Sequence, residues 1–305
     1  MAWLWTGKIW FLYLFIGCGT FVHFRGRVRH RFTRQLLDHS TIMGPYNCFV
    51  YATSQVENRP LMDRAAFPEL ELLRDNWQVF RDEALNLFNE GYIRKAASDN
   101  DLAFHSFFQT GWKRFYLKWY SEAQPSARAL CPRSVALVEQ VPGVNAAMFA
   151  LLPAGAALGK HRDPFAGSLR YHLGLVTPND PRCAIYVDGE QHVWHDGQDV
   201  VFDETFIHWA ENRTDQDRII LFCDVERPLR YHFATWINRG FKRVVVSATS
   251  TENVAGDRVG VLNRIFDVVY KVRARAKQLK RRQRGLYYLL KWLLIGGLLY
   301  LVFIR

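Results

Sequence analysis

Residues 169–202, LRYHLGLVTPNDPRCAIYVDGEQHVWHDGQDVVF, contain short apolar runs that are separated by turn sequences. The separators are Pro-Asn-Asp at 178–180 and Asp-Gly pairs at 188–189 and 196–197. An Asp-Gly pair between two short strands is typical of a tight β-hairpin. The same pattern continues on both sides and predicts strands at residues 145–152, 169–176, 183–187, 191–194, 199–202 and 218–225. Strands of this length and spacing predict a mainly β domain, either a sandwich or a barrel.

Helices are predicted on the N-terminal side of these strands. Residues 68–91 carry apolar side chains near helical spacing, with Pro68 in the first turn and Gly91 at the end. Residues 127–141 predict a second helix, which ends at Pro142. Between them, the aromatic segment 112–120 predicts one more strand.

The formal net charge of +11 is concentrated in two basic blocks, residues 25–34 and 271–284. Each block adjoins a long apolar segment, and no nucleic-acid-binding module accompanies them. We therefore expect lipid head groups as partners, not nucleic acid. The five cysteines show no close spacing, which predicts reduced thiols and gives no support to a disulfide framework or a zinc site.

Two apolar segments, residues 3–24 and 286–304, are long enough in sequence to predict a transmembrane helix at each end. A signal peptide is the alternative for the first segment, and an apolar core helix is the alternative for the second. The basic blocks lie on the inner side of both segments, which by the positive-inside rule predicts a cytoplasmic domain between two spans. The resulting regions are an anchor at 1–24, a basic juxtamembrane segment at 25–66, the β domain with its helical N-terminal part at 67–255, a basic helix at 256–284 and a second span at 285–305.

The sequence His161-Arg162-Asp163 holds the first candidate site. On an extended segment the side chains of His161 and Asp163 point to the same side. His208 follows 45 residues after Asp163, at the end of a predicted strand over residues 202–208. Two histidines and one carboxylate on one face of an ion form the ligand set of non-haem Fe(II) oxygenases. Alone, the His-x-Asp pattern is weak evidence, because a surface ion pair is its commoner explanation.

Three further residues are candidates for holding a carboxylate ligand beside that ion. Arg218 begins the strand after His208, and a hairpin between the two strands would bring its guanidinium near the ion. A planar fork of donors suits bidentate capture of a carboxylate such as that of 2-oxoglutarate, although a solvated arginine at a strand edge is the alternative. Arg170 and His172 share one face of their strand, which faces either the interior or solvent.

Residues 161–228 include HRDPFAGSLRYHLGL and FDETFIHWAENRTDQDRIILFCDVERP, and they resemble the aspartyl/asparaginyl β-hydroxylase family of 2-oxoglutarate oxygenases. The resemblance to the bacterial lipid A 2-hydroxylases is closer and covers nearly the whole chain, including NDLAFHSFFQTGWKRFYLKWY at 100–120 and both apolar ends. It implies a double-stranded β-helix (jelly-roll or cupin-like) core with flanking α-helices. It also implies Fe(II) as cofactor, with 2-oxoglutarate and O2 as co-substrates.

By matching position, the resemblance implies that His161 and His208 are iron ligands. It also implies that Arg218 binds the distal carboxylate of 2-oxoglutarate and that Arg170 and His172 support that co-substrate. The animal peptide-hydroxylating members carry a glycine where this chain has Asp163. Asp163 therefore either completes a full triad, which we favour, or lies behind the ligands without touching the metal.

The resemblance implies hydroxylation of C2 of a secondary fatty acyl chain of lipid A at the bacterial inner membrane. The segment 112–120 could line an apolar groove for that chain. Lys160 and Arg162 could meet lipid phosphates, although a solvated surface charge is the commoner role for such a residue. One alternative is a peptide hydroxylase that acts on Asp or Asn side chains with the same iron site. Another is a non-catalytic membrane scaffold whose histidines are structural. The sequence specifies neither the acyl chain nor the oligomeric state.

Overall fold

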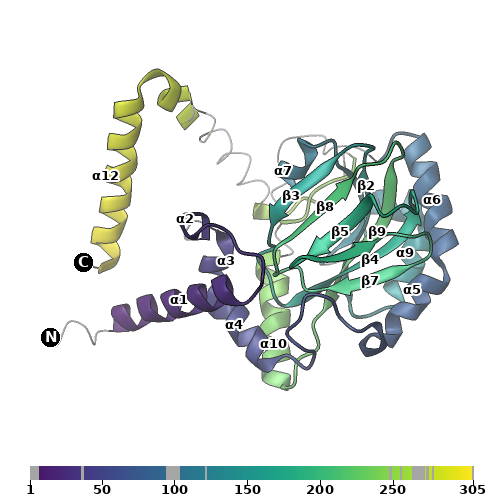
Figure 1. Cartoon of the computed structure of the whole chain (residues 1–305), viewed down its shortest axis with the longest axis horizontal. Coiled ribbons are helices and arrows are strands. Elements are labelled where there is room, and N and C mark those ends of the chain that lie inside the picture. The colour runs from purple at the N-terminus through teal and green to yellow at the C-terminus, as the bar shows by residue number, and fades with distance from the viewer. Residues whose placement is uncertain are drawn as a thin grey trace.

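Two antiparallel β-sheets form the main body of the molecule, on the right of Figure 1. A computed structural model describes residues 7–35, 38–93, 104–120, 122–246, 249–254, 256–262 and 278–303, together with 272, 275 and 276. The larger sheet has the order β1 (Lys113–Trp119), β2 (Val144–Leu152), β9 (Arg218–Glu226), β4 (Ser168–Val176) and β7 (Asp199–Phe202). The smaller sheet has the order β3 (Ala157–His161), β8 (His208–Asn212), β5 (Cys183–Val187) and β6 (Glu190–Val193). The prediction of a mainly β domain is confirmed.

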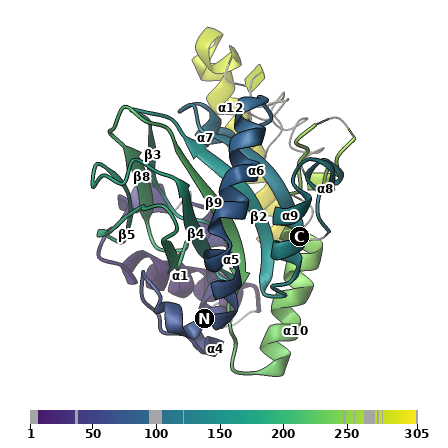
Figure 2. The ribbon, with the colours of Figure 1, turned by 90° about the vertical axis from the view of Figure 1, so that its right-hand side faces the viewer.

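Each face of the larger sheet has its own apolar layer. On the outer face, helices pack against side chains such as Phe149 and Leu221 (Figure 2). On the inner face, Met148 and Ile220 pack against Ile185 of the smaller sheet. The strands of the larger sheet are therefore buried on both sides, which explains why they are long apolar runs in the sequence.

The helices on the outer face occupy the predicted regions but are shorter than predicted. Residues 68–91 form a 3-10 turn at Pro68–Leu70, α5 at Glu71–Asp75 and α6 at Trp77–Asn89. Gly91 follows with φ of +76°, a conformation that glycine adopts without strain. The second predicted helix is divided into α8 (Pro125–Leu130) and α9 (Pro132–Glu139). Pro132 restricts the residue before it to a non-helical conformation, and so the first helix ends there.

Two strands of the smaller sheet, β8 and β3, were not predicted from the sequence. The predicted strand at 202–208 does not form, because the Asp203 carboxylate accepts the backbone N–H of Thr205 at 3.0 Å and closes a turn. His208 therefore begins β8 instead of ending a strand. The strand β3 was not predicted, because most of its side chains are at least partly exposed and the apolar alternation is missing.

A group of helices lies at one end of the two sheets (Figures 1 and 2). These are α1 (Gly7–Phe24), α2 (Phe32–Gln35), α3 (His39–Ile42), α4 (Gly44–Thr53) and α10 (His232–Phe241). The segment after α1 is tied to the β domain by Arg25, which is buried and ion-paired with Asp203. This arginine of the first basic block is therefore not available to lipid head groups.

The predicted transmembrane helices are not supported. Within the part of the chain that the structure describes, none of the helices combines the length and the apolar character that crossing a bilayer requires. A span needs about 20 consecutive apolar residues, whereas Lys8 lies within α1 and Lys291 lies within α12 (Arg284–Phe303). The prediction of a two-span inner-membrane protein with a cytoplasmic domain is therefore wrong.

Other sequence predictions have different outcomes. All five cysteines are free, and three of them are buried, in agreement with reduced thiols. The predicted basic helix at 256–284 lies partly outside the described residues. Of those described, residues 256–260 are not helical and residues 278–282 are. The division into five regions stays a prediction.

Candidate active site

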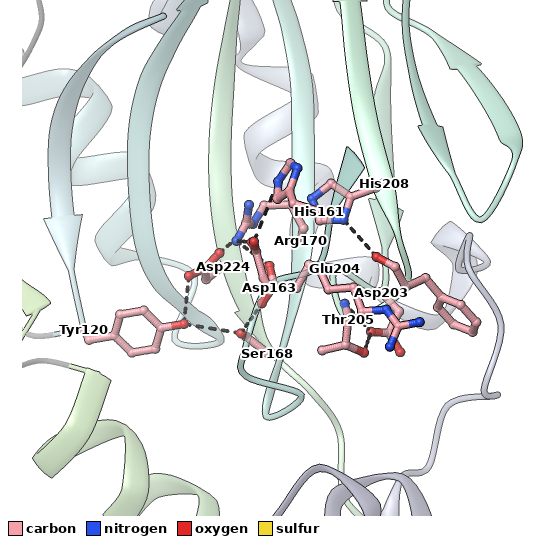
Figure 3. A network of polar contacts seen from close by, with 12 residues as sticks. Tyr120, His161, Asp163, Ser168, Arg170, Asp203, Glu204, Thr205, His208 and Asp224 are labelled. Carbon is pink, nitrogen blue, oxygen red and sulfur yellow. Dashed lines mark hydrogen bonds and ion pairs between the residues drawn. The ribbon is translucent and has the colours of Figure 1, made fainter. Parts of the chain in front are cut away.

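Two neighbouring strands of the smaller sheet bring the candidate histidines together (Figure 3). His161 ends β3 and His208 begins β8, and the two residues are opposite each other in the antiparallel register. Their ring centroids are 4.2 Å apart. Asp163 follows β3, and the ligand atoms of all three residues lie within 4.8 Å of one another. The structure thus brings the three predicted metal ligands to one point.

The two imidazoles are oriented for binding through Nε2. Nδ1 of His161 is 2.7 Å from the carbonyl oxygen of Gly159, and Nδ1 of His208 is 3.0 Å from that of Phe206. These contacts favour the tautomer with hydrogen on Nδ1 and leave the lone pair of Nε2 free. Burial lowers the pKa of both histidines, that of His208 to about 3. Both rings are therefore neutral at pH 7, as metal binding requires.

Asp163 completes the set with a carboxylate that is ionised. Its Oδ2 accepts a hydrogen bond from Nη2 of Arg170 at 2.7 Å, while Oδ1 lies 3.8 Å from Nε2 of His161. Burial raises the pKa of Asp163, but the Arg170 guanidinium and the two imidazoles outweigh it and hold the pKa at about 2. Two neutral imidazoles and one carboxylate fit a divalent ion such as Fe(II). The side chains of His161 and Asp163 are 21% and 20% exposed, so the site opens on that side.

The Arg170 guanidinium is surrounded by three carboxylates (Figure 3). It forms ion pairs with Asp163, Glu204 and Asp224, and Tyr120 donates a hydrogen bond to the far oxygen of Asp224 at 2.8 Å. Burial raises the pKa of Glu204 and that of Asp224, which favours a proton on the cluster and limits its net negative charge. Arg170 therefore orients Asp163, and its predicted contact with a co-substrate stays a prediction.

The loop that carries Asp163 is held from behind by the N-terminal helices. Nη1 of Arg162 donates to the carbonyl oxygen of Val22 at 3.0 Å, and a ring nitrogen of His39 lies 2.8 Å from the Arg162 carbonyl. Nδ2 of Asn47 donates to the carbonyl of Pro164 at 3.0 Å. The Arg162 side chain is thus buried and occupied, so the suggestion that it meets lipid phosphates is wrong.

A pocket between the two sheets adjoins the three ligands. It is lined by His161, His208, Arg170, His172, Trp194 and Arg218, and by aromatic rings between them. Arg170 and His172 are buried and face this pocket. Their side chains therefore point to the interior and not to solvent.

Arg218 enters the pocket from the larger sheet. The predicted hairpin between its strand and that of His208 is wrong, because β9 and β8 belong to different sheets. The chain changes sheets after Asn212, whose side-chain amide donates to the carbonyl oxygens of Pro153 and Gln216. The two strands therefore contribute to the pocket from opposite walls.

Arg218 is a buried cation that has no acidic partner among the described residues. Its side chain is 2% exposed, and it forms no ion pair or side-chain hydrogen bond with any residue that the structure describes. Its guanidinium carbon lies 4.2 Å from the ring centroid of Trp194. Burial lowers the pKa of Arg218 to about 10. An uncompensated buried cation is costly, and an anionic ligand in the pocket would supply the missing charge.

Two further polar groups in the pocket lack hydrogen-bond partners. Both ring nitrogens of His172 and Nε1 of Trp194 are buried without partners among the described residues. Buried polar groups are rarely left unpaired in folded proteins. Together with Arg218 they fit a carboxylate ligand, which could accept several of their hydrogen bonds.

Three of the residues described above were not found by sequence reasoning. Trp194 was assigned only to a strand, and Glu204 only to the region before His208. Asp224 carried a visible signal, since it is a charge within the apolar run IILFCDV of residues 219–225. A charged residue inside a buried strand indicates an ion pair or a site.

The sequence model described as aspartyl/asparaginyl beta-hydroxylase matches residues 74–228, about half of the chain. The chain belongs to this family. The matched range contains every candidate site residue named above. The family assignment thus confirms the resemblance at family level.

Two curated relatives have related names. An ornithine lipid ester-linked acyl 2-hydroxylase of Rhizobium tropici is 30% identical over 187 residues, which cover 60% of this chain and 66% of that protein. Human aspartyl/asparaginyl beta-hydroxylase is 26% identical over 161 residues, covering 51% of this chain and 21% of that protein. The chain thus spans only part of each relative.

Solved structures with a related arrangement include a prolyl-4-hydroxylase of Pseudomonas putida, with a TM-score of 0.33 and 19% identity over 50% of this chain and 87% of that one. A cupin domain of a transcriptional regulator from Enterobacter cloacae gives a TM-score of 0.27 and 13% identity over 37% of this chain and 95% of that one.

Proposed function

We propose that this chain is an Fe(II)- and 2-oxoglutarate-dependent hydroxylase that acts on C2 of a lipid-linked fatty acyl chain. The observation that carries the proposal is the convergence of His161, Asp163 and His208 beside a pocket that holds the unpaired Arg218. A metal ligand set with open positions and a cation for a distant carboxylate are the two features that such a reaction needs.

The residues at the metal site have separate roles. His161, His208 and Asp163 would hold the iron, and Arg170 keeps the Asp163 carboxylate turned toward it. Bound iron, with 2-oxoglutarate and O2, supplies the oxidation: one oxygen atom enters the C–H bond, the other enters succinate, and CO2 leaves.

On the opposite wall, Arg218 would bind the distal carboxylate of 2-oxoglutarate. His172 and Trp194 would donate hydrogen bonds beside it, since each has a buried donor that finds no partner in the described part of the chain. The rings of Phe202 and Phe222 enclose His172 and exclude water from this part of the pocket.

The surroundings of the metal ligands support an apolar substrate. The Phe107 ring lies 4.8 Å from that of His161, and Trp112 lines the same pocket. An acyl C–H bond offers no hydrogen bond, so contacts of this kind must position it. The similarity to an acyl 2-hydroxylase agrees with this substrate class. Within that class, we propose a secondary acyl chain of lipid A as the substrate.

A direct test incubates the purified chain with Fe(II), 2-oxoglutarate and O2 in the presence of lipid A, ornithine lipid or an acidic peptide. We expect succinate and a mass increase of one oxygen atom with lipid A. Turnover with ornithine lipid alone would support acyl hydroxylation and reject lipid A as the substrate. Turnover with the peptide alone would support the peptide hydroxylase.

The scaffold alternative is tested with the same assay. His161→Ala and His208→Ala should abolish succinate formation while circular dichroism shows a folded protein. Full activity of both variants would reject the proposed metal site, and an inactive wild-type protein under all conditions would favour a scaffold.

A further inference from the structure

The outer face of α10 is apolar and exposed. Phe233, Trp236 and Ile237 are 56%, 77% and 39% exposed, and their spacing places them on one side of the helix. An amphipathic helix of a globular domain normally turns such a stripe toward the core. Here the stripe points away from it.

The orientation of α10 is fixed by its other face. Asn238 is buried, donates to the carbonyl oxygen of Gly167 at 3.0 Å and accepts the hydroxyl of Tyr46 at 2.8 Å. The Phe241 ring stacks on that of Phe165 at 5.3 Å. These contacts fix which face of α10 points inward. The outward orientation of the apolar stripe is therefore set by the fold and does not come from a loosely held helix.

The same contacts connect α10 to the metal site. Phe165 and Gly167 belong to the loop that follows Asp163, and this loop leads into β4. The exposed stripe therefore lies on the far side of the helix that supports the metal-bearing loop.

The exposed charge at this end of the molecule is mainly basic. Residues 227–251, which include α10, contain no Asp or Glu, and neither do residues 1–37, which include α1. Exposed arginines flank the stripe and the end of α1: Arg230, Arg239, Arg27, Arg29 and Arg31. Of these, Arg239 is paired with Glu226 at 3.1 Å and Arg27 lies 3.9 Å from Glu190. The helices α1, α4 and α10 lie together at this end (Figures 1 and 2).

We propose that the outer face of α10 docks on an anionic lipid surface. Phe233, Trp236 and Ile237 would enter the interfacial region of the lipid, and the neighbouring arginines would meet its phosphates. The helix lies along the surface and does not cross it. This inference rests on the proposed function. A lipid surface at α10 would present acyl chains next to the loop that holds Asp163.

Vesicle flotation of the full chain without iron tests the docking directly. We expect binding to phosphatidylglycerol vesicles and weaker binding to phosphatidylcholine vesicles. The double variant Trp236→Asp/Ile237→Asp should bind at least about tenfold more weakly, because two large apolar side chains no longer leave water. Val261→Asp is the matched control, since Val261 is 63% exposed outside α10 and should bind like the wild type.

A second measurement reports on Trp236 itself. Brominated phosphatidylglycerol should quench the fluorescence of the wild type more than that of Trp236→Phe, because the indole at 236 would lie among the lipids. Equal quenching of the two proteins, or unchanged vesicle binding by the double variant, would overturn the proposal. A concentration-dependent dimer that is lost in the double variant, without vesicle binding, would assign the face to a second copy of the chain.

The test separates docking from catalysis. On lipid dispersed in detergent the double variant should turn over like the wild type, and it should be slower only on vesicles. Vesicle binding without any lipid hydroxylation would leave the docking intact and reject the substrate. If the wild type and the double variant hydroxylated vesicle lipid at the same rate, the docking proposal would be rejected and the proposed hydroxylase activity would stand.

Discussion

Replacing Arg218 by Met should have two effects of opposite sign. The apo protein should become more stable, and the binding of 2-oxoglutarate should be lost. Both effects follow from a guanidinium that is 2% exposed and has no acidic partner among the described residues. Met is an unbranched side chain that fills space adaptably and carries no charge.

The magnitudes follow from burial and charge. Burial lowers the pKa of Arg218 from 12.5 to about 10, and at roughly 1.4 kcal/mol per unit this corresponds to about 3 kcal/mol of penalty in the apo state. Arg218→Met should therefore raise the free energy of unfolding of the apo protein by up to about 3 kcal/mol. Loss of one partner of a buried charge pair costs about 2–5 kcal/mol, so the Kd for 2-oxoglutarate should rise at least about thirtyfold.

Thermal unfolding and calorimetric titration measure the two effects. The variant should unfold at a higher temperature than the wild type without ligand, and 2-oxoglutarate with Mn(II) should no longer raise its Tm. Arg227→Met is the matched control. Arg227 is similarly buried, but it is ion-paired with Asp203 at 2.7 Å. Because Asp203 keeps Arg25 as a partner, removal of Arg227 should destabilise the protein by about 1–3 kcal/mol.

One pair of results would refute this reasoning. If Arg218→Met destabilised the apo protein as much as Arg227→Met does and kept the affinity for 2-oxoglutarate, Arg218 would be a structural residue.

Three other predictions concern the metal ligands and the pocket. Asp163→Ala should weaken Mn(II) binding by calorimetry if its carboxylate is a ligand, and an unchanged Kd would place it behind the ligands. Arg170→Gln should weaken Mn(II) binding by about 10- to 100-fold, because it frees the carboxylate of Asp163 to turn; a Kd equal to that of the wild type would remove its orienting role.

The third of these concerns acid stability, measured by urea unfolding at pH 7, 6 and 5. Burial lowers the pKa of His208 to about 3 and that of His172 well below its usual range, so as the pH falls below about 6.5 the unfolded chain binds protons that the native one does not. Stability should fall by up to about 1.4 kcal/mol per pH unit for each such histidine, and His172→Gln should show a shallower decline; identical slopes would mean that His172 is not buried as a neutral ring.

The strands that the sequence predicted are those that alternate with clear turns. Asp-Gly at 188–189 and 196–197 marks the ends of apolar runs, and the structure has positive φ at Asp188, Gly189 and Gly197. The strand β3 could not be found in this way, because it is mostly exposed and is defined by its pairing with β8. Local patterns do not contain that long-range information.

The metal ligands were found in the sequence because two of them, His161 and Asp163, are only two residues apart. The Arg170 cluster could not be found, since Glu204 and Asp224 come from different parts of the chain and meet Arg170 only in the folded domain. The chain ends were misjudged because the sequence prediction counted apolar residues across charged ones, such as Lys8 in α1 and Lys291 in α12.

X-ray diffraction at the iron absorption edge, from crystals grown without oxygen in Fe(II) and 2-oxoglutarate, tests the site most directly. We expect one anomalous peak at bonding distance from Nε2 of His161, Nε2 of His208 and a carboxylate oxygen of Asp163, with the distal carboxylate of 2-oxoglutarate on the Arg218 guanidinium. An iron peak away from the two histidines, or a co-substrate that leaves Arg218 without a partner, would contradict the proposed active site.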